Sequence, residues 1–142
     1  MGPLKLLPQA MARPWGGRRL VERYGKAAPP DGAPLGETWE ASDLPGKVSL
    51  VATGPHAGRP VTDVIGRPLP VLLKLLDARE VLSLQVHPDE QSAEEIGGDA
   101  RPKTEAWHIL WNDPGAVIYF GTKPGVSADE LLEACEIGRA HV

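Results

Sequence analysis

The sequence lacks most of the features that mark secreted, membrane-bound or nucleic-acid-binding proteins. It contains a single cysteine, Cys135, which excludes an internal disulfide framework. No apolar run approaches the length of a membrane span, and the first residues lack the basic segment and apolar core of a signal peptide. The formal net charge of -4 argues against binding to a phosphate backbone. These absences predict a cytoplasmic protein that contacts neither a membrane nor nucleic acid.

Turn-forming residues are abundant. The 142 residues include 16 glycines and 15 prolines, which suits a turn-rich β protein better than a helical one. Apolar residues make up 42% and charged residues 24%, as in an ordinary globular domain that can bury a core. The composition therefore predicts one mainly β domain, of a jelly-roll or related double-sheet type.

The alternation of apolar and polar residues predicts strands at 37–42 and 81–87, and a hairpin whose strands, 103–111 and 116–120, flank a four-residue turn. The almost wholly apolar run at 69–76 fits either a buried strand or a buried helix segment. Its short length and Pro70 favour a strand.

Local signals also predict short helices. We expect a helical turn at 18–24 and a short helix at 89–96, which Gly97 ends. Ser127 and Glu130 form a capping-box pattern, which predicts a further helix from that point.

Two of the predicted strands carry residues that could bind a metal ion. Side chains alternate along a strand, so Gln85 and His87 share one face together with Ser83, and Lys103 and Glu105 share a face of the other strand. An imidazole, a carboxylate and an amide oxygen are suitable ligands for a borderline metal ion. The pattern predicts a metal site with a lysine beside it.

Each of these residues also has a simpler interpretation. His87 could cap a strand before a proline, Gln85 could be a buried hydrogen-bonding residue, and Lys103 could be a solvent-exposed lysine. Glu105 could be solvated, although Trp107 next to it indicates a buried strand, where an unpaired carboxylate is costly. We expect the tryptophans of that strand, Trp107 and Trp111, to pack in the interior.

These motifs resemble type I phosphomannose isomerases, zinc enzymes of the cupin superfamily. The resemblance lies in Leu-Ser-Leu-Gln-Val-His-Pro-Asp at 82–89 and in Lys-Thr-Glu-Ala-Trp at 103–107. Shorter matches are Trp-Gly-Gly at 15–17, Gly-Glu-Thr-Trp at 36–39 and the run at 72–78, so the resemblance extends from about Pro14 to Gly121.

The resemblance implies a partial cupin-type jelly roll and an isomerase that interconverts mannose 6-phosphate and fructose 6-phosphate. It implies zinc ligands at Gln85, His87 and Glu105, and an active-site role for Lys103 in catalysis and substrate binding. Ser83, on the face of Gln85, is expected to contribute a hydroxyl to the sugar phosphate. The family's further histidine ligand and its arginine lie far downstream and have no counterpart in these 142 residues.

The order of motifs predicts three regions. Residues 1–126 are expected to be the N-terminal part of the catalytic domain, and 127–136 the start of a helical region. The last six residues, 137–142, can be back-translated into the start of a widely used sequencing adapter, which predicts a non-native tail on a truncated reading frame. We therefore expect weak zinc binding and little activity from the chain alone.

Two other functions fit parts of the pattern. A non-catalytic cupin module that binds a sugar or a metabolite would keep the sheet without needing a metal. A different metal-dependent cupin, such as a dioxygenase, would use two histidines and one carboxylate on iron. Gln85 in the first ligand position argues against the dioxygenase.

Overall fold

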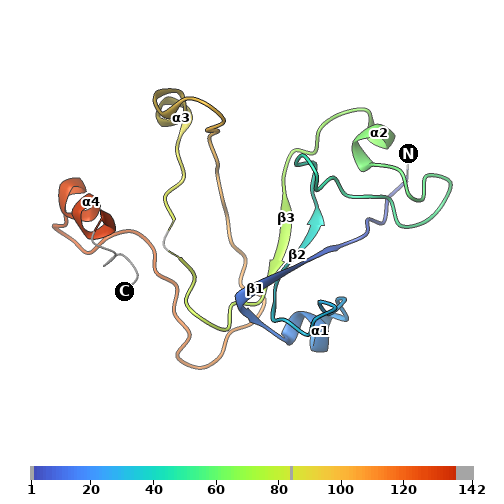
Figure 1. Ribbon diagram of the computed structural model, residues 1–142, viewed down its shortest axis with the longest axis horizontal. Coiled ribbons are helices and arrows are strands. Elements are labelled where there is room, and N and C mark those ends of the chain that lie inside the picture. Colours follow the sequence, from blue (N-terminus) through green and yellow to red (C-terminus); the bar gives the residue numbers. More distant parts are fainter. Residues whose placement is uncertain (1, 84, 137–142) are drawn as a thin grey trace. The chain divides into compact units, whose positions relative to one another are not determined.

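The computed structural model describes residues 2–83 and 85–136, and the chain divides into two compact units between Leu82 and Ser83 (Figure 1). The N-terminal unit contains the sheet, whereas the C-terminal unit contains the predicted metal ligands. The predicted non-native tail, 137–142, and Leu84 lie outside the described residues.

The N-terminal unit is built on a three-stranded antiparallel sheet. Its strands are β1 (Gln9–Gly17), β2 (Leu35–Ala41) and β3 (Leu73–Leu76), in the order β1-β2-β3. The first four residues of the central strand β2 are buried, and Thr38 pairs with one residue on each neighbouring strand. The predicted strand at 37–42 is confirmed, and that at 69–76 is confirmed over its second half.

Strand β1 was not predicted from the sequence. Pro14 lies within it, and a proline is tolerated in a sheet only where a strand has a free edge or a bulge. β1 provides both, since it is an edge strand and its register against β2 shifts between Ala12 and Gly17.

Short helices join these strands. The predicted turn at 18–24 forms α1 (Arg19–Tyr24), which ends where Gly25 adopts the left-handed conformation with φ 61°. Helix α2 (Val61–Ile65) had no clear signal in the sequence.

Both helices of the C-terminal unit were predicted. In α3 (Glu90–Ile96) the Asp89 carboxylate accepts the Ser92 amide at 2.8 Å, as an N-cap should. Before α4 (Ala128–Glu136), Ser127 and Glu130 accept each other's backbone amides, which confirms the capping box. Among the described residues, no helix has the length and apolar character needed to cross a membrane.

The strands predicted at 81–87, 103–111 and 116–120 are not formed among the described residues. The turn between the last two is present, with the Ala116 amide donating to the Asp113 carbonyl at 3.0 Å, but the flanking segments run without strand pairing. The prediction that Trp107 and Trp111 pack inside is wrong, because they are 52% and 43% exposed. A lone hairpin is at best marginally stable without a further strand or helix to cover it.

A buried carboxylate holds together the ends of the outer strands of the sheet. Asp77 directly follows β3, is 6% exposed, and accepts the Arg19 amide at 2.7 Å, while its own amide donates to the Gly36 carbonyl at 2.9 Å. Gly17, the last residue of β1, packs so closely on this carboxylate that a Cβ atom there would overlap it. The junction therefore requires glycine at position 17.

Replacing Gly17 by alanine should destabilise the N-terminal unit. The added methyl group displaces the Asp77 carboxylate from the Arg19 amide, and overpacking of this kind costs about 1–3 kcal/mol. Urea unfolding followed by circular dichroism measures the loss. Gly2→Ala is the matched control, because nothing lies within 4 Å of its added Cβ. Equal stability of the two variants would contradict the role given to Gly17.

Candidate metal and substrate site

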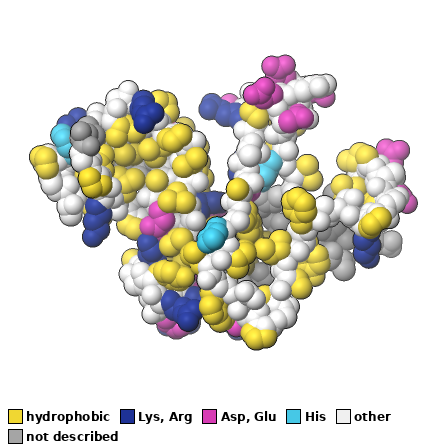
Figure 2. Space-filling view, turned by 180° about the vertical axis from the view of Figure 1, so that it is seen from behind, with side chains coloured by type: hydrophobic (Ala, Val, Ile, Leu, Met, Phe, Trp, Pro, Cys, Tyr) yellow, Lys and Arg dark blue, Asp and Glu magenta, His cyan; other side chains and the backbone are white. Residues whose placement is uncertain are grey.

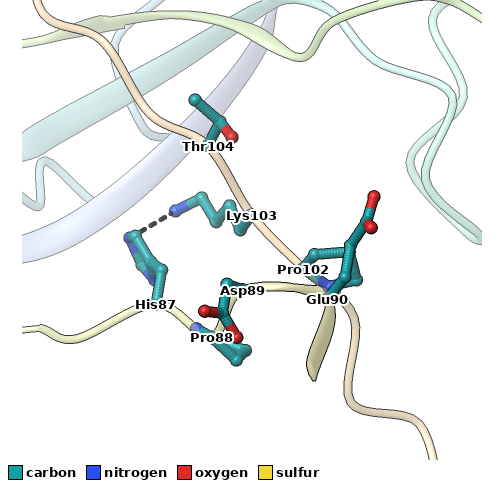
Figure 3. A pocket seen from close by; sticks show the side chains of 7 residues that line it. All are labelled: His87, Pro88, Asp89, Glu90, Pro102, Lys103 and Thr104. Carbon is teal, nitrogen blue, oxygen red and sulfur yellow. Dashed lines mark hydrogen bonds between the residues drawn. The ribbon is translucent and has the colours of Figure 1, made fainter. Parts of the chain in front are cut away.

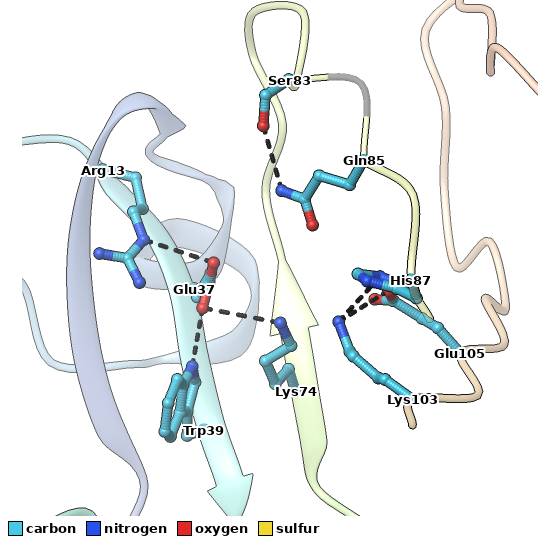
Figure 4. Close-up of polar contacts among 9 residues, drawn as sticks. All are labelled: Arg13, Glu37, Trp39, Lys74, Ser83, Gln85, His87, Lys103 and Glu105. Carbon is cyan, nitrogen blue, oxygen red and sulfur yellow. Dashed lines mark hydrogen bonds and ion pairs between the residues drawn. The ribbon is translucent and has the colours of Figure 1, made fainter. Parts of the chain in front are cut away.

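Three of the predicted site residues converge in the C-terminal unit. The His87 imidazole Nε2 lies 2.7 Å from the Glu105 carboxylate oxygen Oε2, and the Lys103 Nζ lies 3.0 Å from both atoms (Figure 4). The His87 and Glu105 side chains are only about a quarter exposed, at 26% and 25%. The pattern of the sequence thus identified three groups that meet in space.

Local chain geometry, rather than a sheet, brings these residues together. Helix α3 begins just after Pro88, and the glycines that follow it turn the chain back on itself. The Lys103 amide then donates to the Pro88 carbonyl at 3.2 Å, which fixes the returning segment beside His87. Lys103 and Glu105 are two residues apart on an extended backbone, so both side chains point to the same side.

The electrostatics of this cluster favour the ionised carboxylate. The pKa of Glu105 is lowered from 4.5 to about 2, chiefly by the hydrogen bond from Lys103 and against the opposing effect of burial. The hydrogen bond to His87, the charge of Lys103 and a hydrogen bond with Trp107 lower it further. Glu105 is therefore an anion at neutral pH, the form in which a carboxylate binds a metal ion.

Gln85 and Ser83 form a separate pair. The Gln85 amide Nε2 donates to the Ser83 hydroxyl at 3.0 Å (Figure 4), so the two residues are neighbours, as their shared face predicted. Within the described part of the chain, no hydrogen bond joins this pair to His87 or Glu105. Because its nitrogen donates to Ser83, Gln85 retains its amide oxygen, the atom that would bind a metal ion.

A hollow of about 380 Å³ opens beside the cluster, and the side chains of His87 and Lys103 face it (Figure 3). Its volume lies within the range typical of sites for small molecules. The lining residues are His87, Pro88, Asp89, Glu90, Pro102, Lys103 and Thr104.

The donor set is chemically suited to zinc. His87 Nε2 and Glu105 Oε2 lie 2.7 Å apart, and each lies 3.0 Å from the Lys103 Nζ, so the two atoms are directed at a common point. Among the described residues, no group of three or more His, Cys, Asp and Glu side chains could hold a metal ion. A third protein ligand would therefore have to be a side chain other than His, Cys, Asp or Glu. The amide of Gln85 is such a side chain.

A second charged cluster, in the N-terminal unit, was not predicted. Glu37 on β2 is 7% exposed, and its carboxylate accepts the Trp39 indole at 2.7 Å and the Arg13 guanidinium at 3.4 Å. Lys74 on β3 lies 4.0 Å away (Figure 4). Alternation along β2 places Glu37 and Trp39 on one face, but the cations come from strands whose pairing the sequence did not reveal. Together these donors compensate the cost of burying the carboxylate.

Removing the Lys103 ammonium should raise the pKa of Glu105 in the metal-free chain. Its hydrogen bond is the largest cause of the low value, so Lys103→Met should move the pKa from about 2 upward towards 4.5. NMR titration of the Glu105 carboxyl measures the change, and Lys123→Met is the control for the loss of one positive charge. An unchanged pKa in Lys103→Met would show that Lys103 does not hold this carboxylate.

The same shift predicts the direction of a pH effect on stability. Because the folded-state pKa of Glu105 is depressed, its ionised form stabilises the fold at pH values above 4.5. That contribution should be lost as the pH falls from 4.5 towards 2, and the Lys103→Met variant should lose less over this window. Comparison of unfolding free energies at pH 6 and pH 3 checks the sign.

Comparison with known proteins places the chain in a family. Residues 4–108 match the model of the phosphomannose isomerase type I catalytic domain. The chain is 35% identical over 147 residues to the mannose-6-phosphate isomerase of Streptococcus mutans, a match that covers 96% of this chain and 45% of that protein. It is 37% identical over 119 residues to the probable mannose-6-phosphate isomerase GmuF of Bacillus subtilis, covering 76% of this chain and 37% of that protein.

A solved structure agrees with these matches. The crystal structure of a mannose 6-phosphate isomerase from Bacillus subtilis is 33% identical, with a TM-score of 0.59, over 67% of this chain and 33% of that chain. This likeness confirms the predicted fold class, a partial cupin-type jelly roll with short helices. The chain spans less than half the length of the curated relatives it matches. The family match covers most of the chain, and the chain therefore belongs to the type I phosphomannose isomerases.

Proposed function

We propose that the protein is a zinc-dependent isomerase that interconverts mannose 6-phosphate and fructose 6-phosphate. The convergence of His87, Glu105 and Lys103, in a chain of this family, is the observation that supports the proposal. The matched relatives are named as mannose-6-phosphate isomerases, which supports a sugar phosphate as the substrate.

In this proposal His87, Glu105 and Gln85 hold the zinc ion. The low pKa of Glu105 keeps its carboxylate ionised. The Gln85 amide nitrogen donates to Ser83, which leaves the amide oxygen as the atom that would bind the ion. Bound zinc supplies Lewis-acid polarisation of substrate oxygens. The ligand set is small enough to leave an open coordination position for substrate, as catalytic zinc sites require.

Lys103 is proposed to act on the substrate directly. Isomerisation moves a proton between adjacent carbons of the sugar, and negative charge develops on an oxygen as an enediol forms. The Lys103 ammonium faces the hollow beside His87 and can donate to that oxygen, which lowers the energy of the charged intermediate. Ser83 is proposed to contribute its hydroxyl to the sugar phosphate.

Zinc binding by the 142-residue chain should depend on His87. The chain should bind Zn²⁺ weakly, and His87→Ala should weaken binding at least about tenfold, because one of few strong ligands is lost. Equilibrium dialysis at pH 7 with metal analysis measures the affinity. His108→Ala is the matched control, since His108 is exposed and lies outside the cluster. Equal affinities of the two variants would mean that His87 is not a ligand.

Isomerase activity should depend on Lys103. In the protein expressed from the complete gene, Lys103→Met should lower kcat for mannose 6-phosphate by about 10²–10⁴-fold, the range lost with a catalytic proton donor. A coupled assay that detects fructose 6-phosphate measures the rate, with Lys123→Met as control. A zinc-loaded protein that binds mannose 6-phosphate without converting it would support a sugar-binding cupin module and refute the isomerase.

A further inference from the structure

The Lys103 ammonium lies where the proposed zinc site would hold its cation. Its Nζ is 3.0 Å from the His87 Nε2 and 3.0 Å from the Glu105 Oε2 (Figure 4). Figure 2 shows lysine and arginine side chains projecting from the surface, which is the usual place for these solvated cations. The Lys103 side chain is 44% exposed, yet its ammonium is directed at two electron-rich atoms. This placement sets Lys103 apart from an ordinary surface lysine.

Zinc and the ammonium compete for the same lone pair. Zinc bonds to an imidazole nitrogen or a carboxylate oxygen at about 2.0–2.2 Å, so an ion bound to Nε2 and Oε2 must lie close to both atoms. Binding through the His87 Nε2 also needs the tautomer that carries its proton on Nδ1. In that tautomer Nε2 can only accept, and the Lys103 ammonium is a donor within reach. The lone pair can then serve either the lysine or the metal ion.

The contact between the two ligands has to open as well. The His87 Nε2 and the Glu105 Oε2 lie 2.7 Å apart. Two ligands at about 2.1 Å from a tetrahedral zinc ion lie about 3.4 Å from each other. Zinc must therefore separate the two atoms and displace the ammonium that lies beside both. The charge-assisted hydrogen bond from Lys103 to Glu105 is lost in that step, and its loss opposes zinc binding.

The hollow beside the cluster offers the displaced ammonium another position. Lys103 lines this hollow together with Asp89 and Glu90, whose carboxylates attract a cation (Figure 3). The flexible four-carbon stem of a lysine can carry its ammonium between two such places. In the hollow the ammonium is free to act on the substrate.

We infer that Lys103 is an internal competitor of zinc, whose ammonium occupies the cation position beside His87 and Glu105 until the metal ion displaces it into the hollow. The inference rests on the proposed function, because it takes His87 and Glu105 as zinc ligands. It adds an order of events to that function. The lysine becomes available to the sugar phosphate only after the metal ion is bound.

The zinc affinity of the 142-residue chain tests the competition. Lys103→Met should bind Zn²⁺ at least about tenfold more tightly than the unaltered chain, because the metal ion no longer has to break a hydrogen bond between charged groups. Equilibrium dialysis at pH 7 measures the affinities. Lys123→Met is the matched control for the loss of one exposed positive charge, and its affinity should stay unchanged. Equal or weaker binding by Lys103→Met would overturn the inference.

NMR of the unaltered chain distinguishes displacement from simple repulsion between two nearby cations. Saturating Zn²⁺ should move the Lys103 Nζ resonance to the value of a solvated lysine, for which the exposed Lys123 is the internal reference. An unchanged Lys103 resonance would mean that the ammonium stays in place. It would overturn the inference even if Lys103→Met binds zinc more tightly. This measurement does not depend on the folding of any variant.

The His87→Ala variant separates this inference from the proposed function. If His87→Ala binds zinc as tightly as the unaltered chain, the proposed zinc site is wrong and the competition is refuted with it. If His87→Ala binds zinc more weakly but Lys103→Met does not bind it more tightly, the zinc site stands and only the competition is refuted. Both readouts report metal binding, and neither depends on isomerase activity.

Discussion

Backbone pairing decides which parts of this chain form a sheet. A strand is stable when neighbours satisfy its amides and carbonyls and cover its apolar face. Strand β2 has both neighbours and buries Leu35 and Thr38 almost completely. Residues 104–110 and 117–120 have a similar preference for β structure but no paired strand among the described residues, and most of their large apolar side chains are exposed. The same constraint explains both the ordered sheet and the unpaired hairpin.

The candidate site does not depend on that pairing. Helix α3 and its capping residue Asp89 reverse the chain locally, and one backbone hydrogen bond from Lys103 to Pro88 brings the ligands together. Charge then organises the side chains, since the Lys103 ammonium donates to the Glu105 carboxylate, which lies 2.7 Å from the His87 imidazole. A small, locally formed cluster can bring predicted metal ligands together even where the neighbouring segments form no paired strands.

Two buried carboxylates show how the N-terminal unit accommodates charge. Asp77 accepts a backbone amide, and Glu37 accepts the indole of Trp39 and lies among cations from both neighbouring strands. A carboxylate deprived of such partners would be expensive to bury, so each cluster links elements distant in sequence. These contacts hold the three strands in register. The sequence motifs that predicted the metal site did not include the residues that form them.

The sequence by itself determined the local features. Caps and glycines located α3 and α4, and alternation located β2. The motifs identified His87, Lys103 and Glu105 as partners before their distances were known. These features depend on residues close together in the chain or on recurring spacing, which a sequence displays directly. The predicted zinc roles of Gln85, His87 and Glu105, and the predicted roles of Lys103 and Ser83 toward the substrate, stay predictions.

Only the tertiary structure decided features that depend on distant neighbours. β1 is a strand because β2 lies beside it, although the sequence analysis predicted no strand there and Pro14 lies within it. Trp107 and Trp111 are 52% and 43% exposed, although their alternation suggested an interior. The Glu37 cluster likewise exists because three paired strands bring its cations to one carboxylate. Pairing and burial are properties of the assembled chain, and periodicity alone does not specify the partner that provides them.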